Sequence, residues 1–157
     1  MQLNKQKMLF DLFTTVFIQL DMDNARSKGN GFPQIGDTLQ VRVPIGDGDD
    51  MITIDLMLVS LNDKLDILQF YTVIVPEIGE GYDDLVQALP EMNFYCPAGS
   101  FGIYQEGRQF YHRYGLFMPA NMEPQEAARE TMDILELLFN LINDQYIKIR
   151  RMSKGKA

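Results

Sequence analysis

The spacing of apolar residues in the middle of the chain predicts a run of β-strands. In segment 38–45 every second residue is apolar, which is the period of a half-buried strand. Segments 51–61 and 64–75 are rich in β-branched and aromatic residues, and the dipeptide Asn62–Asp63 between them is typical of a tight turn. Both segments carry apolar residues on both faces toward one end. We therefore expect three antiparallel strands, with a covering layer or a partner over that end.

The two ends of the chain follow a different period. Apolar residues recur at steps of three and four in segment 5–21 and again over about 124–147, which predicts two amphipathic helices. Pro124 suits the first turn of the second of these helices. A short helix is predicted between the strands and the last helix, over residues 83–89, and Pro90 is expected to end it.

The stretch FYCPAGSFGIYQEGRQFYHRYGLF, residues 94–117, predicts a β-hairpin with its turn at Glu106–Gly107. In that register Tyr104 lies opposite Gln109 and Phe101 lies opposite His112. The predicted element order is helix, three strands, short helix, two strands, helix. This order gives an α+β fold with a mainly antiparallel five-stranded sheet and helices at both ends.

The same stretch contains the only cysteine and the only histidine of the chain, Cys96 and His112. The hairpin register places Cys96 opposite Phe117, five residues from His112, or about 16 Å along the sheet. A nucleophile and its base must approach to about 3 Å. The register therefore predicts that the two residues do not form a catalytic dyad. We expect Cys96 to be a small buried apolar residue and His112 to belong to an aromatic strand face.

Charge is distributed unevenly along the 157 residues. The net charge is −8, yet residues 148–157 hold five of the fourteen basic side chains and no acidic one. Residues 1–147 therefore have nine basic and twenty-two acidic side chains, a net charge of −13, and such a body repels nucleic acid. We expect a single domain over 1–147 and a flexible basic tail over 148–157. The tail is either a solvated end or a contact for an acidic partner or RNA.

Several common kinds of site are not supported by the sequence. None of the three Gly-x-Gly triplets continues as a dinucleotide-binding fingerprint, and no P-loop is present. One cysteine and one histidine do not make a structural zinc site. The acidic turn GDGDD, residues 46–50, lacks the length and terminal glutamate of an EF-hand loop and is expected to be a solvated turn. We expect no cofactor and no metal. The acidic residues near the short helix are interpreted as surface charge rather than an acid–base pair; they are Glu77, Glu80, Asp83 and Asp84.

The most informative pattern is the width of the apolar surface on the last helix. At 100° per residue its apolar arc covers roughly 220°, whereas a helix that covers a sheet needs an arc of about 100°. Packing on the sheet and on the first helix is one use for the excess. The other is a flank that binds a second copy or another protein. The candidate partner-binding residues on the two flanks are Met132, Leu137, Phe139 and Leu141.

The segment LPEMNFYCPAGSFGIYQEGRQFYHRYGLFMPANMEPQEAARETMDILELLFNLINDQY resembles the C-terminal half of the YbjN-like and type III secretion chaperone-like superfamily. There too, a hairpin with an acidic-Gly turn leads into a long helix, and the preceding elements match in order, so the likeness covers about residues 5–147. The resemblance implies a cofactor-free fold, often homodimeric, that binds other polypeptides. Two features depart from the group: a Gly-rich segment at 24–37, expected to be a loop, and the basic end.

These observations favour a non-enzymatic protein-binding module, chaperone-like or regulatory, that holds a polypeptide through apolar helix flanks and strand edges. An immunity-type protein that neutralises one partner fits the sequence equally well. A rival hypothesis is a small-ligand-binding protein or enzyme whose pocket is lined by Tyr71, Tyr104, Tyr111, His112 and Tyr114. One cysteine, no signal peptide pattern and no long apolar segment lead us to expect a cytoplasmic protein that binds neither membrane nor nucleic acid.

Overall fold

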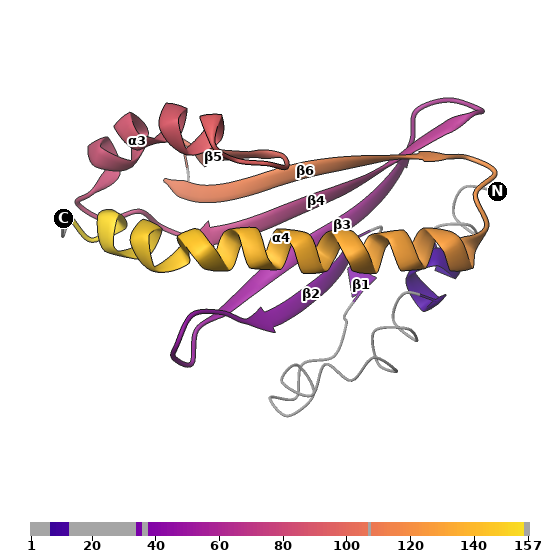
Figure 1. Cartoon of the computed structure of the whole chain (residues 1–157), viewed down its shortest axis with the longest axis horizontal. Coiled ribbons are helices and arrows are strands. Elements are labelled where there is room, and N and C mark those ends of the chain that lie inside the picture. The colour runs from indigo at the N-terminus through magenta and orange to yellow at the C-terminus, as the bar shows by residue number, and fades with distance from the viewer. Residues whose placement is uncertain (1–6, 13–33, 36–37, 107, 156–157) are drawn as a thin grey trace.

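An antiparallel sheet forms the centre of the structure, a computed structural model that describes residues 7–12, 34–35, 38–106 and 108–155 (Figure 1). The strands lie in the order β1-β2-β3-β4-β6-β5, and every neighbouring pair is antiparallel. Their bounds are β1 Gln34–Ile35, β2 Thr38–Pro44, β3 Met51–Ser60, β4 Leu65–Val75, β5 Ser100–Tyr104 and β6 Gln109–Pro119. The five predicted strands are confirmed. The two-residue β1 is an addition, inside the segment that we expected to be a loop.

The described helical segments match the predicted element order. Residues 7–12 are helical, α3 spans Tyr82–Phe94, and α4 spans Pro124–Ser153 with the proline in its first turn. Most of the first predicted helix, 5–21, lies outside the described residues. Among the helices that the structure describes, none is both long and apolar enough to cross a bilayer.

Helix α3 extends beyond Pro90, so the prediction that this proline ends the helix is wrong. A proline inside a helix leaves the carbonyl four residues earlier, here that of Val86, without its hydrogen bond. Val86 and Pro90 are both exposed, so water reaches the freed carbonyl. The apolar spacing also continues past the proline, because Leu85 and Met92 are buried on the inner side of α3.

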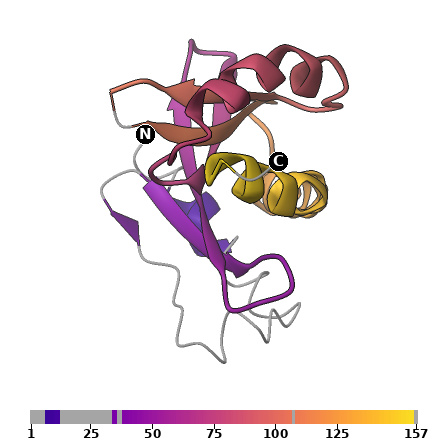
Figure 2. The same ribbon diagram turned by 90° about the vertical axis from the view of Figure 1, so that its left-hand side faces the viewer.

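The helices lie on one side of the sheet. Figure 2 shows α3 and α4 together on the right of the strands, with no described helix on the left. Along β4 buried residues alternate with half-buried ones, as expected when one sheet face is covered. The covered face contributes Leu56, Leu68 and Phe70 to the core, and α4 contributes Leu138 and Ile142. On the other face Phe117 keeps 60% of its surface exposed.

The C-terminal end of α4 packs against the glycine-containing loop before α3. The amide of Gly81 donates a 3.1 Å hydrogen bond to the carbonyl oxygen of Ser153, and the Ser153 hydroxyl accepts one from Gly79. A Cβ atom at Gly81 would overlap the carbonyl oxygen of Met152. This Gly-x-Gly triplet therefore serves a close approach of two backbones.

Residues 148–153 are consequently not a free tail, and the boundary predicted after residue 147 falls inside α4. Ile149 is fully buried and Ser153 is nearly so, whereas the basic side chains around them point to solvent or are half-buried. The prediction of a tail was wrong because it followed the charge that dominates this stretch. The apolar stripe of α4 nevertheless continues into this stretch through Ile149 and the half-buried Met152.

This packing predicts how the chain responds to truncation. A chain that stops after Ile147 loses the buried side chain of Ile149 and the hydrogen bonds to Gly79 and Gly81, and we expect its free energy of unfolding to fall by about 3 kcal/mol or more. A chain that stops after Gly155 keeps these contacts and serves as the control. Urea unfolding followed by circular dichroism measures both. Equal midpoints for the two chains would show that the end of α4 contributes nothing to stability.

Candidate functional site

Cys96 and His112 lie close together, contrary to the separation of about 16 Å predicted from the hairpin. The Sγ atom of Cys96 is 3.8 Å from Nε2 of His112. The predicted register itself is confirmed, since Phe101 pairs with His112 and Tyr104 with Gln109. The error concerns Cys96. Strand β5 begins only at Ser100, and the chain before it folds back over the strand instead of extending opposite Phe117.

Two local features produce this fold-back. Gly99 adopts a φ of +70°, a conformation that L side chains rarely adopt, and a Cβ atom there would lie 2.8 Å from the His112 ring. Asn93, near the end of α3, accepts a 2.7 Å hydrogen bond from the amide of Phe101 and donates a 3.0 Å bond to its carbonyl. The Asn93 side chain thus holds β5 as a neighbouring strand would, and places Cys96 over the histidine.

The electrostatics do not activate the thiol. Nε2 of His112 is 2.8 Å from the carbonyl oxygen of Ala98, and because a carbonyl only accepts, Nε2 carries the hydrogen. Nε2 is therefore not free to take a proton from Cys96, and Nδ1 is buried without a partner. Burial lowers the pKa of His112, against a smaller opposing effect of the Ala98 hydrogen bond, and burial raises the pKa of the Cys96 thiol. Neutral thiol and neutral imidazole are the stable forms at neutral pH.

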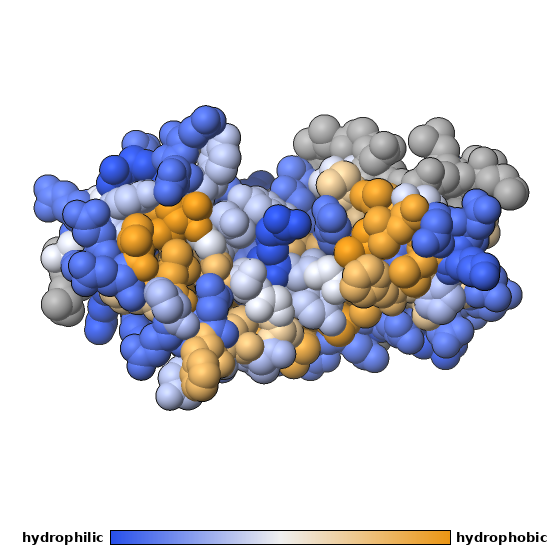
Figure 3. Space-filling view, turned by 90° about the horizontal axis from the view of Figure 1, so that it is seen from above, coloured by the Kyte–Doolittle hydropathy of each residue, from blue (hydrophilic) through white to orange (hydrophobic). Residues whose placement is uncertain are grey.

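A larger feature lies beside this pair. Helices α3 and α4 run next to each other, and between them is a cleft with a volume of about 470 Å³, called here the α3–α4 cleft. Viewed from above, hydrophobic residues gather in two areas, and the left one lies on the side of the molecule where α3 and the C-terminal half of α4 are found (Figure 3). The apolar lining of the cleft consists of Ala88, Met92, Phe101, Leu137 and Leu141, with Cys96 among them.

The α3–α4 cleft contains two of the four predicted partner-binding residues. Leu137, with 46% of its surface exposed, and the half-buried Leu141 line it. Met132 and Phe139 are half-buried, pack against the core and do not line the cleft. Leu141 also packs against the core, so the two flanks of α4 differ in that one of them additionally lines the cleft, where Leu137 is exposed.

The α3 wall of the cleft was missed because the predicted helix stopped at Pro90. The signal that could have found it is the spacing of Leu85, Ala88 and Met92, which continues at steps of three and four across the proline. Tyr95, which also lines the cleft, and the adjacent Phe94 are strongly exposed, and their rings meet edge to face with centroids 4.9 Å apart.

The predicted tyrosine-lined pocket does not exist as one site. His112 and Tyr114 lie on the face of β6 that the helices cover, where Tyr114 packs beside Phe70. Tyr71 and Tyr111 stack on the opposite face, with ring centroids 5.0 Å apart. Side chains alternate between the faces of a strand, so residues one position apart on β6 cannot line a common cavity. Tyr104 is exposed and donates a hydrogen bond to Glu106.

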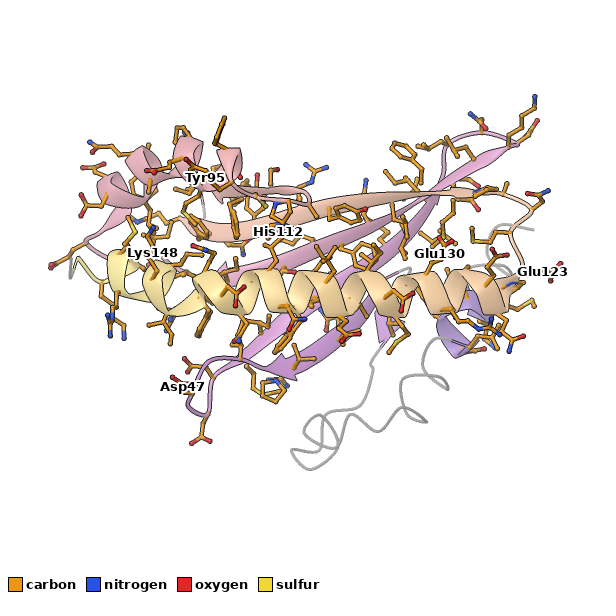
Figure 4. All side chains as sticks on the ribbon, in the orientation of Figure 1. Asp47, Tyr95, His112, Glu123, Glu130 and Lys148 are labelled. Atoms are coloured by element: carbon orange, nitrogen blue, oxygen red, sulfur yellow. The ribbon has the colours of Figure 1, made fainter. Side chains whose placement is uncertain are left out.

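The acidic turn between β2 and β3 contacts the basic end of α4. Figure 4 labels Asp47 at this turn. Tyr146 donates a 2.8 Å hydrogen bond to Asp50, and Asn143 accepts one from the amide of Gly46. Burial and the bond to Asp50 raise the pKa of Tyr146 to about 12. Within the part of the chain that the structure describes, no group of His, Cys, Asp or Glu residues is arranged to hold a metal ion.

Comparisons with known proteins provide no further information on the cleft or on the Cys96–His112 pair. No protein-family model matches the chain, and searches of curated proteins and of solved structures found no significant match.

Protonation of His112 is expected to make stability depend on pH. The folded-state pKa lies below the ordinary value of 6.5, so the unfolded chain binds the proton more readily. The contribution of the neutral imidazole to stability is therefore fully present above pH 6.5. Below that pH the free energy of unfolding falls by about 1.4 kcal/mol per pH unit until the pH reaches the folded-state pKa. Urea unfolding at several pH values measures this slope, with His112→Gln as the control for all other groups. Parallel profiles for the two proteins would contradict the buried neutral imidazole.

Cys96 is expected to behave as an ordinary, unactivated thiol. Because burial raises its pKa above the usual value of 9.0, its alkylation rate should climb with pH and reach half of its maximum only above pH 9. His112→Gln should leave this profile unchanged, because the imidazole proton is donated to Ala98. Iodoacetamide labelling followed by mass spectrometry provides the rates. A half-maximum near neutral pH that disappears in the variant would instead indicate a reactive pair.

Proposed function

We propose that this chain is a non-enzymatic protein-binding module that holds another polypeptide in the α3–α4 cleft. The observation that carries the proposal is the apolar lining of this cleft, in which Leu137 is exposed, Ala88 and Leu141 are half-buried, and Met92 is buried beneath them on α3. Apolar side chains in contact with water on two adjacent helices are typical of a surface that is covered by a partner. Tyr95 in the lining and the adjacent Phe94 keep 73% and 81% of their surfaces exposed and add to this surface.

The helix walls are a better binding surface than the nearest strand edge. Strand β5 has one neighbour, β6, so its outer edge is the place where an extended peptide could add to the sheet. The side chain of Asn93 already satisfies both backbone groups of Phe101, the second residue of that edge. An added strand would have to displace it. We therefore assign binding to the helix flanks and not to the edge of β5.

The resemblance to the YbjN-like and type III secretion chaperone-like superfamily supports the same role and extends it. On that basis we propose a chaperone-like or regulatory protein that is homodimeric and needs no cofactor. The single cysteine favours action in the cytoplasm, where thiols stay reduced. The identity of the polypeptide then decides between a chaperone, a regulator and an immunity-type protein.

Photo-crosslinking from inside the cleft tests the proposal. Benzoylphenylalanine replaces Leu137, or replaces Ile147, which is similarly exposed at 44% on the same helix but does not line the cleft. In cells that produce the protein, we expect a discrete crosslinked polypeptide from position 137 and none from position 147. Adding Ala88→Phe should fill the cleft and abolish the crosslink, whereas the matched Val86→Phe, at an exposed site on α3 outside the cleft, should not. Equal crosslinking in all four proteins would refute the assignment.

A further inference from the structure

The chemistry of the cleft indicates what kind of polypeptide it fits. We propose that the bound segment is a basic amphipathic α-helix, and this inference rests on the proposed function. The apolar stripe of the bound helix enters the α3–α4 cleft, and its lysines and arginines contact the acidic surface around the cleft. Three properties of the described residues support this: the pairing of backbone groups within the two helix walls, the charge of the walls, and the width of the apolar lining.

The two helix walls of the cleft offer side chains rather than free backbone groups, and the short segment Tyr95–Pro97 after α3 completes the lining. Ala88, Leu137 and Leu141 lie within helices, where amide and carbonyl groups are paired along the helix. The nearest strand edge is closed by Asn93 at Phe101. A bound segment therefore has to satisfy its own amides and carbonyls while its apolar side chains are buried, and a helix does this within a single segment.

The charge of the walls selects a basic helix. Helix α3 carries three acidic side chains and no basic one, and α4 carries five acidic side chains and one basic one between Pro124 and Ile147. At the cleft itself, Glu91 belongs to α3, and Asp144 and Lys148 to α4. Figure 4 labels Lys148 on α4 and Tyr95 at the end of α3. Lys148 is the last α4 residue of the lining, so it lies at one end and leaves the rest of the rim acidic.

The apolar lining matches the stripe of an amphipathic helix. Leu137 and Leu141 are one turn apart on α4, and Ala88 and Met92 are one turn apart on α3. These two pairs of side chains repeat at the spacing of a helical turn. A third helix with apolar side chains at steps of three and four can therefore place them between the two pairs and pack against both α3 and α4. Ala88 is the small member of the lining and leaves room for an anchor beside Met92.

Cys96 reports occupancy without any substitution, because it is the only cysteine and it lines the cleft. The probe is an acetylated and amidated leucine–lysine peptide of about 16 residues, with leucines at steps of three and four. A second peptide has glutamate in place of every lysine, and a third has two central prolines that prevent a helix. Fluorescence anisotropy of labelled peptides measures binding to the full chain, and the iodoacetamide reaction of Cys96 measures occupation of the cleft.

The lysine peptide is expected to bind about tenfold more tightly than the other two, to weaken between about 50 and 300 mM NaCl, and to slow alkylation of Cys96 several-fold. Leu137→Gln should weaken binding about fivefold or more, and the matched Ile147→Gln should not. Both variants keep the charge of the protein, so their difference isolates the cleft from general attraction to an acidic surface.

Each other result overturns the inference in a recognisable way. If the glutamate peptide binds equally well and also protects Cys96, the cleft binds helices but does not select a basic one, and the proposed function stands. If the proline peptide protects Cys96 equally, the occupant is not helical. If binding leaves the alkylation rate of Cys96 unchanged, or is not weakened by Leu137→Gln, the peptide is held by general attraction to the acidic surface and not by the cleft. If Cys96 of the protein alone becomes protected as its concentration rises, the occupant is a second copy. If no peptide binds, a basic helix is not the occupant, and the crosslinking experiment decides separately whether any polypeptide is.

Discussion

Burial of one sheet face beneath α4 is the interaction on which the other features depend. The helix is about 45 Å long and crosses the whole sheet, with Leu138, Ile142 and Ile149 fully buried along it. The end of this helix reaches the Gly79–Gly81 loop, where the hydrogen bond from Gly81 to Ser153 fixes the point at which α3 begins. Helix α3 lies beside the C-terminal part of α4. The cleft between them is lined by the facing flanks of both helices, by the segment Tyr95–Pro97 after α3 and by Phe101 of β5.

The features that the sequence predicted correctly are those with a strict local period. The strands and the hairpin register follow from alternation and from a short turn, so the pattern alone pairs Phe101 with His112 correctly. The broad apolar arc of α4 also indicated a surplus of apolar surface. The structure divides this surplus unequally. Leu137 stays exposed in the cleft, whereas Leu141, Phe139 and Met132 are half-buried and pack against the core.

The features that were missed depend on contacts between distant segments. Cys96 reaches His112 because Asn93 and Gly99 bend the chain before β5, and neither residue reveals its partner in the sequence. The end of α4 is ordered by a loop more than seventy residues earlier, so its charge alone suggested a free tail. The tyrosine pocket failed for a simpler reason, since it combined residues from both faces of β6. In each case composition was informative, but only the tertiary arrangement decided which side chains meet.

Pro90 has a consequence for the movement of α3. Near its middle the helix lacks one backbone hydrogen bond, on the side that faces water, and its inner side is held mainly by Leu85 and Met92. Less energy is needed to bend a helix at such a point than to bend α4, which has no proline after its first turn. The two walls of the cleft therefore differ in stiffness. Helix α4 is the stiffer wall, and α3 is the wall that bends more easily, at Pro90.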